Sequence, residues 1–176
     1  MSYIYKQSML VLVCIFAFLP NYVFADNISR APANIQASIF FKILAFNKNI
    51  SNGGDVTIYV LGAPDFTKAM KSAVGRKIGK SKLVNVLSIS KLPKDKPKGL
   101  AVIYIGKAKY LDDSIRFCHT HKILSITGNP DLSAKGITLV VGVMNKKAKI
   151  LLNLTSTKKE GIDWKPDVLR IVQKVK

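Results

Sequence analysis

Residues 56–70 read VTIYVLGAPDFTKAM, and this stretch decides the fold class of the chain. Residues 56–61 form a continuous apolar run rich in β-branched side chains, which predicts a buried strand that ends at Gly62. Behind Pro64 and Asp65, apolar side chains recur at i, i+3, i+4, i+7 and i+8, which predicts an amphipathic helix with an acidic first turn. The predicted unit is therefore a strand, a short turn and a helix.

The alternation of strands and helices continues on both sides of this unit. Residues 33–47 carry apolar side chains at helical spacing, which predicts a helix buried on most of its circumference. The other predicted elements are strands over 83–89, 100–105 and 123–127, a helix over 107–119, a hairpin of 137–144 and 148–154, and a closing helix over 166–175. This order predicts an α/β sandwich. Its β-sheet is expected to be mostly parallel, mixed at its edge and flanked by helices, with a closing β-hairpin and a C-terminal helix.

The first 25 residues have the pattern of a signal peptide. Lys6 supplies the charged start, residues 9–19 form an unbroken apolar run, and Val23 and Ala25 stand where a cleavage site has small side chains. The apolar run is shorter than the ~20 residues that span a bilayer, so we expect export to the periplasm and cleavage after Ala25. The expected organisation is a signal peptide over 1–25, a short N-terminal segment over 26–33 and a single α/β domain over 34–176.

The chain is strongly basic, with 28 lysine and arginine residues, 10 acidic residues and a formal net charge of +18. Removal of residues 1–25 takes away only Lys6, which leaves +17. This charge predicts a weak attraction to anionic membrane surfaces. The sequence argues against nucleic acid as a partner, because only four basic residues are arginine and the basic stretches at 68–82 and 91–98 contain no aromatic side chain to stack on bases. A lysine-rich composition without any function explains the charge equally well.

Cys118 is the only cysteine left after the predicted cleavage, so the mature chain cannot form an internal disulfide. The predicted helix over 107–119 turns this side chain toward the core. Two interpretations stay open: the thiol is buried and inert, or it pairs with a second chain in a homodimer.

No motif in the sequence assembles a reactive site. Cys118, His119 and His121 are the only soft metal ligands of the mature chain, and no second cysteine or histidine cluster completes a tetrahedral zinc site. Asp112 and Asp113 are adjacent on a predicted helix, so their side chains diverge and do not form a catalytic pair. We therefore expect no catalytic residues, no bound metal and no cofactor, and a protein that acts by binding.

Two predicted turns repeat one pattern, because LGAPDF at 61–66 and TGNPDL at 127–132 both follow a strand. The carboxyl ends of parallel strands line the crevice in which α/β proteins usually hold ligands. The candidate crevice residues are Gly62, Pro64, Asp65, Gly106, Gly128, Pro130 and Asp131. The alternative is that Gly-x-Pro-Asp is simply favourable chemistry for a turn and a helix start.

Eight short segments occur in an order that is specific, although none of them is specific alone. They are VTIYVLG at 56–62, PDF at 64–66, GRKI at 75–78, VIYIG at 102–106, ILSIT at 123–127, GI at 136–137, ILLNL at 150–154 and GIDWKPDVLRIVQKV at 161–175. With these segments the chain resembles, from about Asn34 to its C-terminus, the YfiR family of small periplasmic regulators. The resemblance implies an exported α/β protein that works by binding and carries out no reaction.

The resemblance also implies a partner. Such a protein holds the periplasmic part of an inner-membrane diguanylate cyclase, or another sensor protein, in check and so lowers cyclic-di-GMP and biofilm formation. The alternative is a periplasmic binding protein for a small anionic ligand in the strand-end crevice. For a protein partner we expect an apolar surface patch ringed by lysines. Phe40, Phe41 and Phe46 lie too far around the first helix to face one core, so they and Trp164 are the candidate partner-binding residues.

Overall fold

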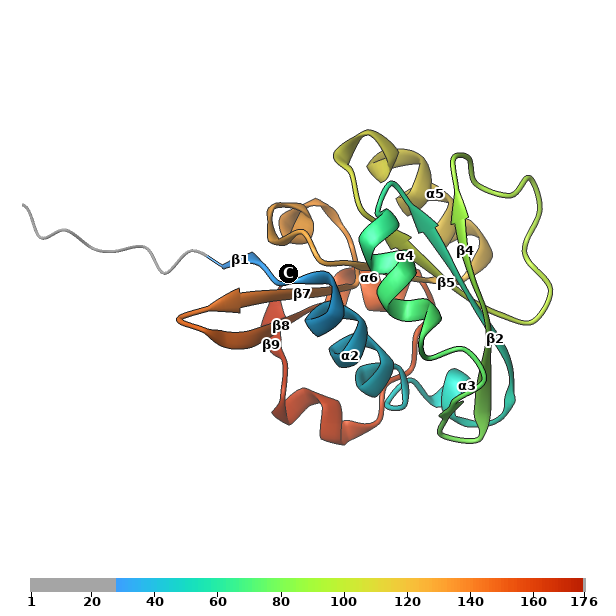
Figure 1. Cartoon of the computed structure of the whole chain (residues 1–176), viewed down its shortest axis with the longest axis horizontal. Helices are drawn as coiled ribbons and strands as arrows, with labels where there is room; N and C mark the ends of the chain where they lie inside the picture. Colours follow the sequence, from blue (N-terminus) through green and yellow to red (C-terminus); the bar gives the residue numbers. More distant parts are fainter. Residues whose placement is uncertain (1–27, 176) are drawn as a thin grey trace, which may run out of the picture.

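The computed structural model describes residues 28–175, and the predicted signal peptide with its cleavage site lies outside this range. Within the range, the strands form one sheet in the order β3-β4-β2-β5-β6-β7-β8-β9, with β1 paired to β7 (Figure 1). The strands are β1 (Ser29–Arg30), β2 (Gly54–Leu61), β3 (Lys77–Ile78), β4 (Ser81–Ile89), β5 (Leu100–Ile105), β6 (Leu124–Thr127), β7 (Leu139–Met144), β8 (Lys147–Asn153) and β9 (Gln173–Val175). The α-helices are α2 (Ala33–Leu44), α3 (Lys48–Ser51), α4 (Pro64–Lys71), α5 (Leu111–His121) and α6 (Leu154–Lys159), and the 3-10 helices are η1 (Ala108–Tyr110), η2 (Pro130–Lys135) and η3 (Pro166–Arg170).

The central strands of the sheet are parallel, and antiparallel pairs lie toward its edges. β2 is parallel to β4 on one side and to β5 on the other, and the parallel set continues through β6 to β7. β8 is antiparallel to β7, and β3 is antiparallel to β4. The predicted α/β sandwich with a mostly parallel, edge-mixed sheet is confirmed, and β7 with β8 forms the predicted hairpin.

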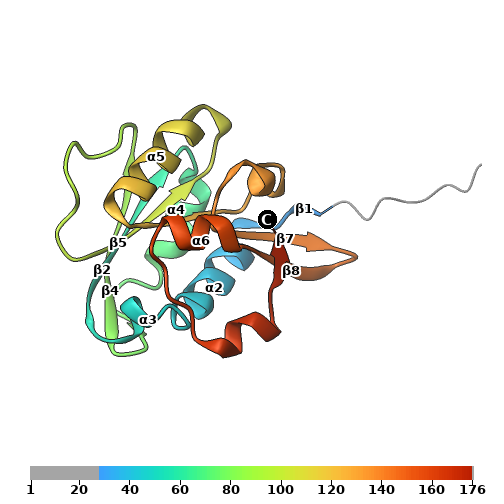
Figure 2. The same ribbon diagram turned by 180° about the vertical axis from the view of Figure 1, so that it is seen from behind.

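Alternate side chains of the strands build two cores, one on each face of the sheet. On β5, Val102 and Tyr104 belong to the core that α2 and α4 cover, whereas Ile103 and Ile105 belong to the core that α5 covers. Figures 1 and 2 show α2 and α4 on one face of the sheet and α5 on the other. Both faces are therefore covered, as a parallel sheet requires.

The predicted closing helix over 166–175 is wrong. Pro166–Arg170 forms only the short 3-10 helix η3, and Gln173–Val175 forms the strand β9. β9 pairs in parallel with β8, so its backbone groups satisfy an edge of the sheet that would otherwise stay open. We infer that the backbone hydrogen bonds to β8 stabilise a strand here more than the helical spacing of the apolar residues stabilises a helix.

The first helix ends earlier than predicted. α2 stops at Leu44 rather than at residue 47. The side chain of Asn47 accepts a hydrogen bond of 3.1 Å from the Ile50 N–H, and this bond caps the start of α3. The chain therefore turns at residues 45–47 and begins a new helix.

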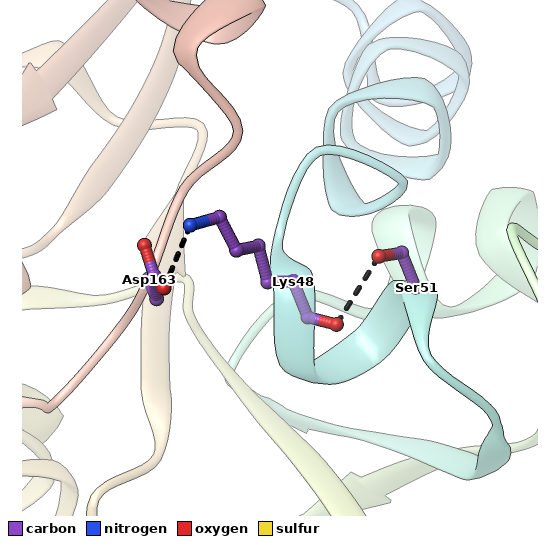
Figure 3. Close-up of polar contacts among 3 residues, drawn as sticks. All are labelled: Lys48, Ser51 and Asp163. Carbon is purple, nitrogen blue, oxygen red and sulfur yellow. Dashed lines mark hydrogen bonds and ion pairs between the residues drawn. The ribbon is translucent and has the colours of Figure 1, made fainter.

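Residues 163–165 of the C-terminal segment form hydrogen bonds and an ion pair with this turn and the start of α3. The Lys48 N–H donates to the Asp163 carbonyl at 2.8 Å, and Lys48 Nζ lies 3.0 Å from Asp163 Oδ2 (Figure 3). The Ser51 hydroxyl donates to the Lys48 carbonyl at 3.1 Å, also visible in Figure 3. The Lys165 N–H donates to the Phe46 carbonyl at 2.8 Å. Because the charges of the ion pair are exposed and exposed pairs contribute little, the backbone hydrogen bonds are the main polar contacts that stabilise this junction.

Candidate functional site

The carboxyl ends of β2 and β5 mark the switch point of the sheet, since the chain places β4 on one side of β2 and β5 on the other. The turns that follow these two strands touch each other. A Cβ atom on Gly106 would lie 2.6 Å from the Cβ of Ala63 and 2.8 Å from the carbonyl oxygen of Gly62, so only glycine permits the approach. Arg30 Nη2 donates to the Gly106 carbonyl at 3.2 Å and so covers this contact.

The N-terminal segment also crosses the end of β6. The Tyr104 hydroxyl donates a hydrogen bond of 2.6 Å to Gln36 Oε1 and accepts one of 3.2 Å from the Gly128 N–H. Gln36 Nε2 donates to the Ala31 carbonyl at 2.6 Å. Burial raises the pKa of Tyr104 to about 12, although the bond from Gly128 and the charge of Arg30 act in the opposite direction. The hydroxyl therefore stays protonated and remains a donor at neutral pH.

A cavity of about 370 Å³ lies beside this network, and Arg30, Gln36 and Tyr104 of the network line it. Three of the seven predicted crevice residues line it: Gly62, Pro64 and Asp65. The other four do not line it: Gly106, Gly128, Pro130 and Asp131. The structure thus brings together only part of the predicted crevice, and the chain's own side chains occupy much of the strand-end edge.

A larger groove of about 820 Å³ lies between α2 and α4, and we call it the α2–α4 groove. α2 contributes Ala33, Ala37 and Phe41, and Ala45 follows directly after its end. The four recur at every fourth residue and therefore lie along one side of the helix axis. The guanidinium carbon of Arg76 lies 4.6 Å from the centroid of the Phe41 ring, close enough for a cation–π contact. The charged residues that line the groove are Lys42, Lys68, Arg76, Lys77 and Asp65. The groove therefore combines an apolar floor with a basic rim.

The four predicted partner-binding residues lie in three different places. Phe40 is fully buried in the core, so it is unavailable to a partner. Phe41 lines the α2–α4 groove. Phe46 and Trp164 both belong to the junction with the C-terminal segment, where Trp164 is buried and forms a β-bridge with Asn47. Of the four, Phe41 alone lies in a groove.

Sequence reasoning missed the groove itself, although the stretch at 68–82 stood out as basic. A signal for it was present on the second predicted helix. Asp65, Lys68, Ala69 and Ser72 stand at i, i+3, i+4 and i+7, a spacing that puts them on one helix face, and all four line the groove. The contribution of the first helix could not be recognised without knowing that the two helices are neighbours.

A buried carboxyl group at the end of α6 is a second feature that the sequence did not reveal. Glu160 is fully buried, and burial raises its pKa to about 7 although hydrogen bonds from Ser125 lower it. Cys118 is free and fully buried, which agrees with its predicted inward position. Burial, with a smaller contribution from the charge of Glu160, raises the pKa of the Cys118 thiol well above its usual value. Neither group lines the groove or the cavity.

Among residues 28–175, no three His, Cys, Asp or Glu side chains gather where they could hold a metal ion. No helix within that same range is long and apolar enough to cross a membrane.

His119, which follows Cys118 on α5, has a pKa lowered by partial burial and by the nearby charges of Lys159 and Lys122.

Comparisons with known proteins identify a family and several solved structures with a similar fold. Residues 33–173 match the family model described as YfiR/HmsC-like. No curated protein matches the chain. The crystal structure of a conserved domain protein from Vibrio cholerae O1 biovar El Tor str. N16961 is similar, with a TM-score of 0.52 and 12% sequence identity. The similarity covers 84% of this chain and 61% of that chain, and at this identity it supports the fold alone.

Proposed function

Because the chain belongs to the YfiR/HmsC-like family of periplasmic regulators, we propose that it represses a diguanylate cyclase of the inner membrane by binding the periplasmic sensor part of that enzyme. Repression lowers cyclic-di-GMP and, with it, biofilm formation. The observation that carries the proposal is the family match over residues 33–173, nearly the whole described chain. A different membrane sensor protein would be held by the same kind of contact.

Two features support action through a surface rather than through a small-ligand site. The α2–α4 groove has the apolar floor and basic rim expected for a protein partner. The strand-end crevice, where α/β proteins usually hold ligands, is crossed by Arg30 and Gln36 of the chain itself. An anionic ligand there would compete with the Gly106 carbonyl for Arg30. Binding of a small anion is therefore the weaker of the two functions.

A regulator of this kind acts by favouring one state of its partner. To convert a cyclase that is almost entirely active into one that is almost entirely inactive, it must bind the inactive state about 10⁴-fold more tightly. The positive charge of the chain assists the encounter, since it attracts the protein to the anionic membrane surface and raises its concentration near a membrane partner.

Deletion of the gene tests the proposal. We expect the deletion to raise cellular cyclic-di-GMP and surface attachment, and a plasmid copy of the gene to restore both. Removal of the responsible cyclase from the deletion strain should abolish the increase. An unchanged nucleotide level, in a deletion strain that keeps all of its cyclases, would overturn the proposed repression and leave the small-ligand function.

A further inference from the structure

The α2–α4 groove, with a volume of about 820 Å³, combines apolar and charged side chains. Ala37 and Ala73 are nearly fully buried at its floor, and the half-buried Phe41 and Ala69 line it as well. Small side chains on both helices leave space that larger ones would fill. The groove therefore has room for apolar side chains from outside the chain.

We propose that this groove holds an amphipathic helix of the partner protein, with carboxylate side chains beside the apolar face of that helix. The inference rests on the proposed function, because it names the surface and the partner segment through which the regulator binds.

The shape of the groove favours a helix as its occupant. α2 spans 12 residues, which corresponds to a length of about 18 Å, and α4 spans 8 residues. A partner helix of two to three turns fits beside them and can place its side chains between the alanines of the floor. A partner strand would instead pair with the backbone of a sheet edge. Among the residues that line the groove, only Lys77 and Ile78 belong to a strand, and this edge strand, β3, is two residues long and offers little backbone for pairing.

The charges of the rim favour an acidic occupant. Lys42, Lys68, Arg76 and Lys77 are all exposed, and the two ion pairs found among residues 28–175 involve none of them. Asp65 is the single acidic residue at the groove. A helix with carboxylates beside its apolar face would be steered to this rim and held in register by it. A small anion would meet only exposed charges, which solvent and salt screen.

Two synthetic helical peptides with the same leucine face test the inference on the full purified protein. One peptide carries glutamates beside that face, and the other carries glutamines in their place. We expect the glutamate peptide to bind at least tenfold more tightly at low salt, and its advantage to shrink as salt is raised. Equal binding of the two peptides, or binding of neither, would overturn the inference.

Matched variants separate the groove from the overall positive charge. Lys42→Glu with Lys68→Glu should weaken binding of the glutamate peptide at least tenfold. Lys94→Glu with Lys98→Glu makes the same change of charge in the exposed loop before β5 and should leave binding within threefold. Ala69→Trp keeps the charge but fills the groove, and it should weaken both peptides. Thermal unfolding of each variant verifies that it is folded, and equal losses in the groove and loop variants would refute a specific site.

The same variants in the deletion strain separate this inference from the proposed function. Suppose that deletion raises cyclic-di-GMP, that the loop variant returns it to the wild-type level and that the groove variant does not. Both the docking site and the proposed repression are then supported. If the groove variant returns cyclic-di-GMP fully to the wild-type level, the docking site is wrong and the proposed repression stands. If deletion has no effect on cyclic-di-GMP, repression is wrong, and the peptide measurements alone decide whether the groove binds an acidic helix.

Discussion

Ser125 donates two hydrogen bonds to the buried carboxyl group of Glu160, one from its backbone N–H at 2.9 Å and one from its hydroxyl. The same hydroxyl accepts a bond of 2.9 Å from the Thr138 N–H. The carboxyl group thus ties β6 to the end of α6 and to the residue before β7. This polar connection lies in the interior, so its protonation affects the stability of the fold.

The stability of the protein should fall as pH rises from about 4.5 to about 7. Burial raises the pKa of Glu160 from 4.5 to about 7, so in this window the folded state keeps a proton that the unfolded state loses. The expected loss is about 3 kcal/mol. Urea unfolding at pH 5 and pH 8 measures it. Glu160→Gln should remove most of the difference in unfolding free energy between the two pH values. The control Asp95→Asn, in an exposed loop, should not. Equal pH dependence in the wild type and both variants would contradict the assignment of this effect to Glu160.

A Cβ atom on Gly128 would lie 1.7 Å from Gln36 Oε1, so Gly128→Ala should expel the Gln36 side chain. We expect a loss of about 1–3 kcal/mol in unfolding free energy, as for other overpacked interiors. On a Gln36→Ala background the same change should cost much less. Urea unfolding of the four proteins gives the coupling energy, and strictly additive effects would show that the two residues do not meet.

The Cys118 thiol should resist modification in the native protein, because it is fully buried and its pKa is raised. A maleimide reagent should label it slowly in buffer and rapidly in urea. Cys118→Ser should keep the fold and partner binding, at a cost of ~1–2 kcal/mol for burying a hydroxyl among apolar groups. A covalent dimer on non-reducing gels that disappears in this variant would show instead that the thiol joins two chains.

Lys146→Gly should stabilise the hairpin of β7 and β8. Asn145 and Lys146 have φ values of 50° and 62°, the pair of positive angles that a type I′ turn requires. Relief of the left-handed conformation at Lys146 should outweigh the added freedom of the unfolded chain by about 0.5 kcal/mol. Thermal unfolding measures the gain. Lys147→Gly, at the first position of β8, should have the opposite sign, and a stabilising effect of both changes would reject this explanation.

The mature protein should begin at Asp26, as the charged start, apolar run and Ala25 of the signal peptide pattern indicate. Amino-terminal sequencing of the native protein measures this directly. Recovery of an intact Met1 in the membrane fraction would favour a permanent anchor.

The elements that the sequence predicted correctly are those decided by their own residues. Residues 56–61 carry enough β-branched and apolar side chains to fix a strand, and Pro64 with Asp65 fixes the start of the next helix. The prediction of a helix over 166–175 was wrong because the structure of this segment depends on a distant strand. Its apolar spacing allows a helix, but the open edge of β8 is available for pairing, and no local pattern reveals that edge.

The candidate site was predicted less well for the same reason. The adjacent residues Phe40 and Phe41 indicate that α2 has two contacting sides, yet only the position of α4 decides that Phe40 is buried and Phe41 lines a groove. Likewise, nothing near Gln36 in the sequence indicates that its amide will lie over Gly128. Contacts between distant elements set these roles.

The pairing of β1 with β7 joins residues that are far apart in the sequence. The Ser29 hydroxyl donates to the Val143 carbonyl at 3.2 Å across 114 positions of sequence. A contact of such long range closes a large loop and forms slowly compared with local ones. Because β1 has a pairing partner only once β7 has formed, we expect the N-terminal segment to cover the strand ends of the sheet late in refolding.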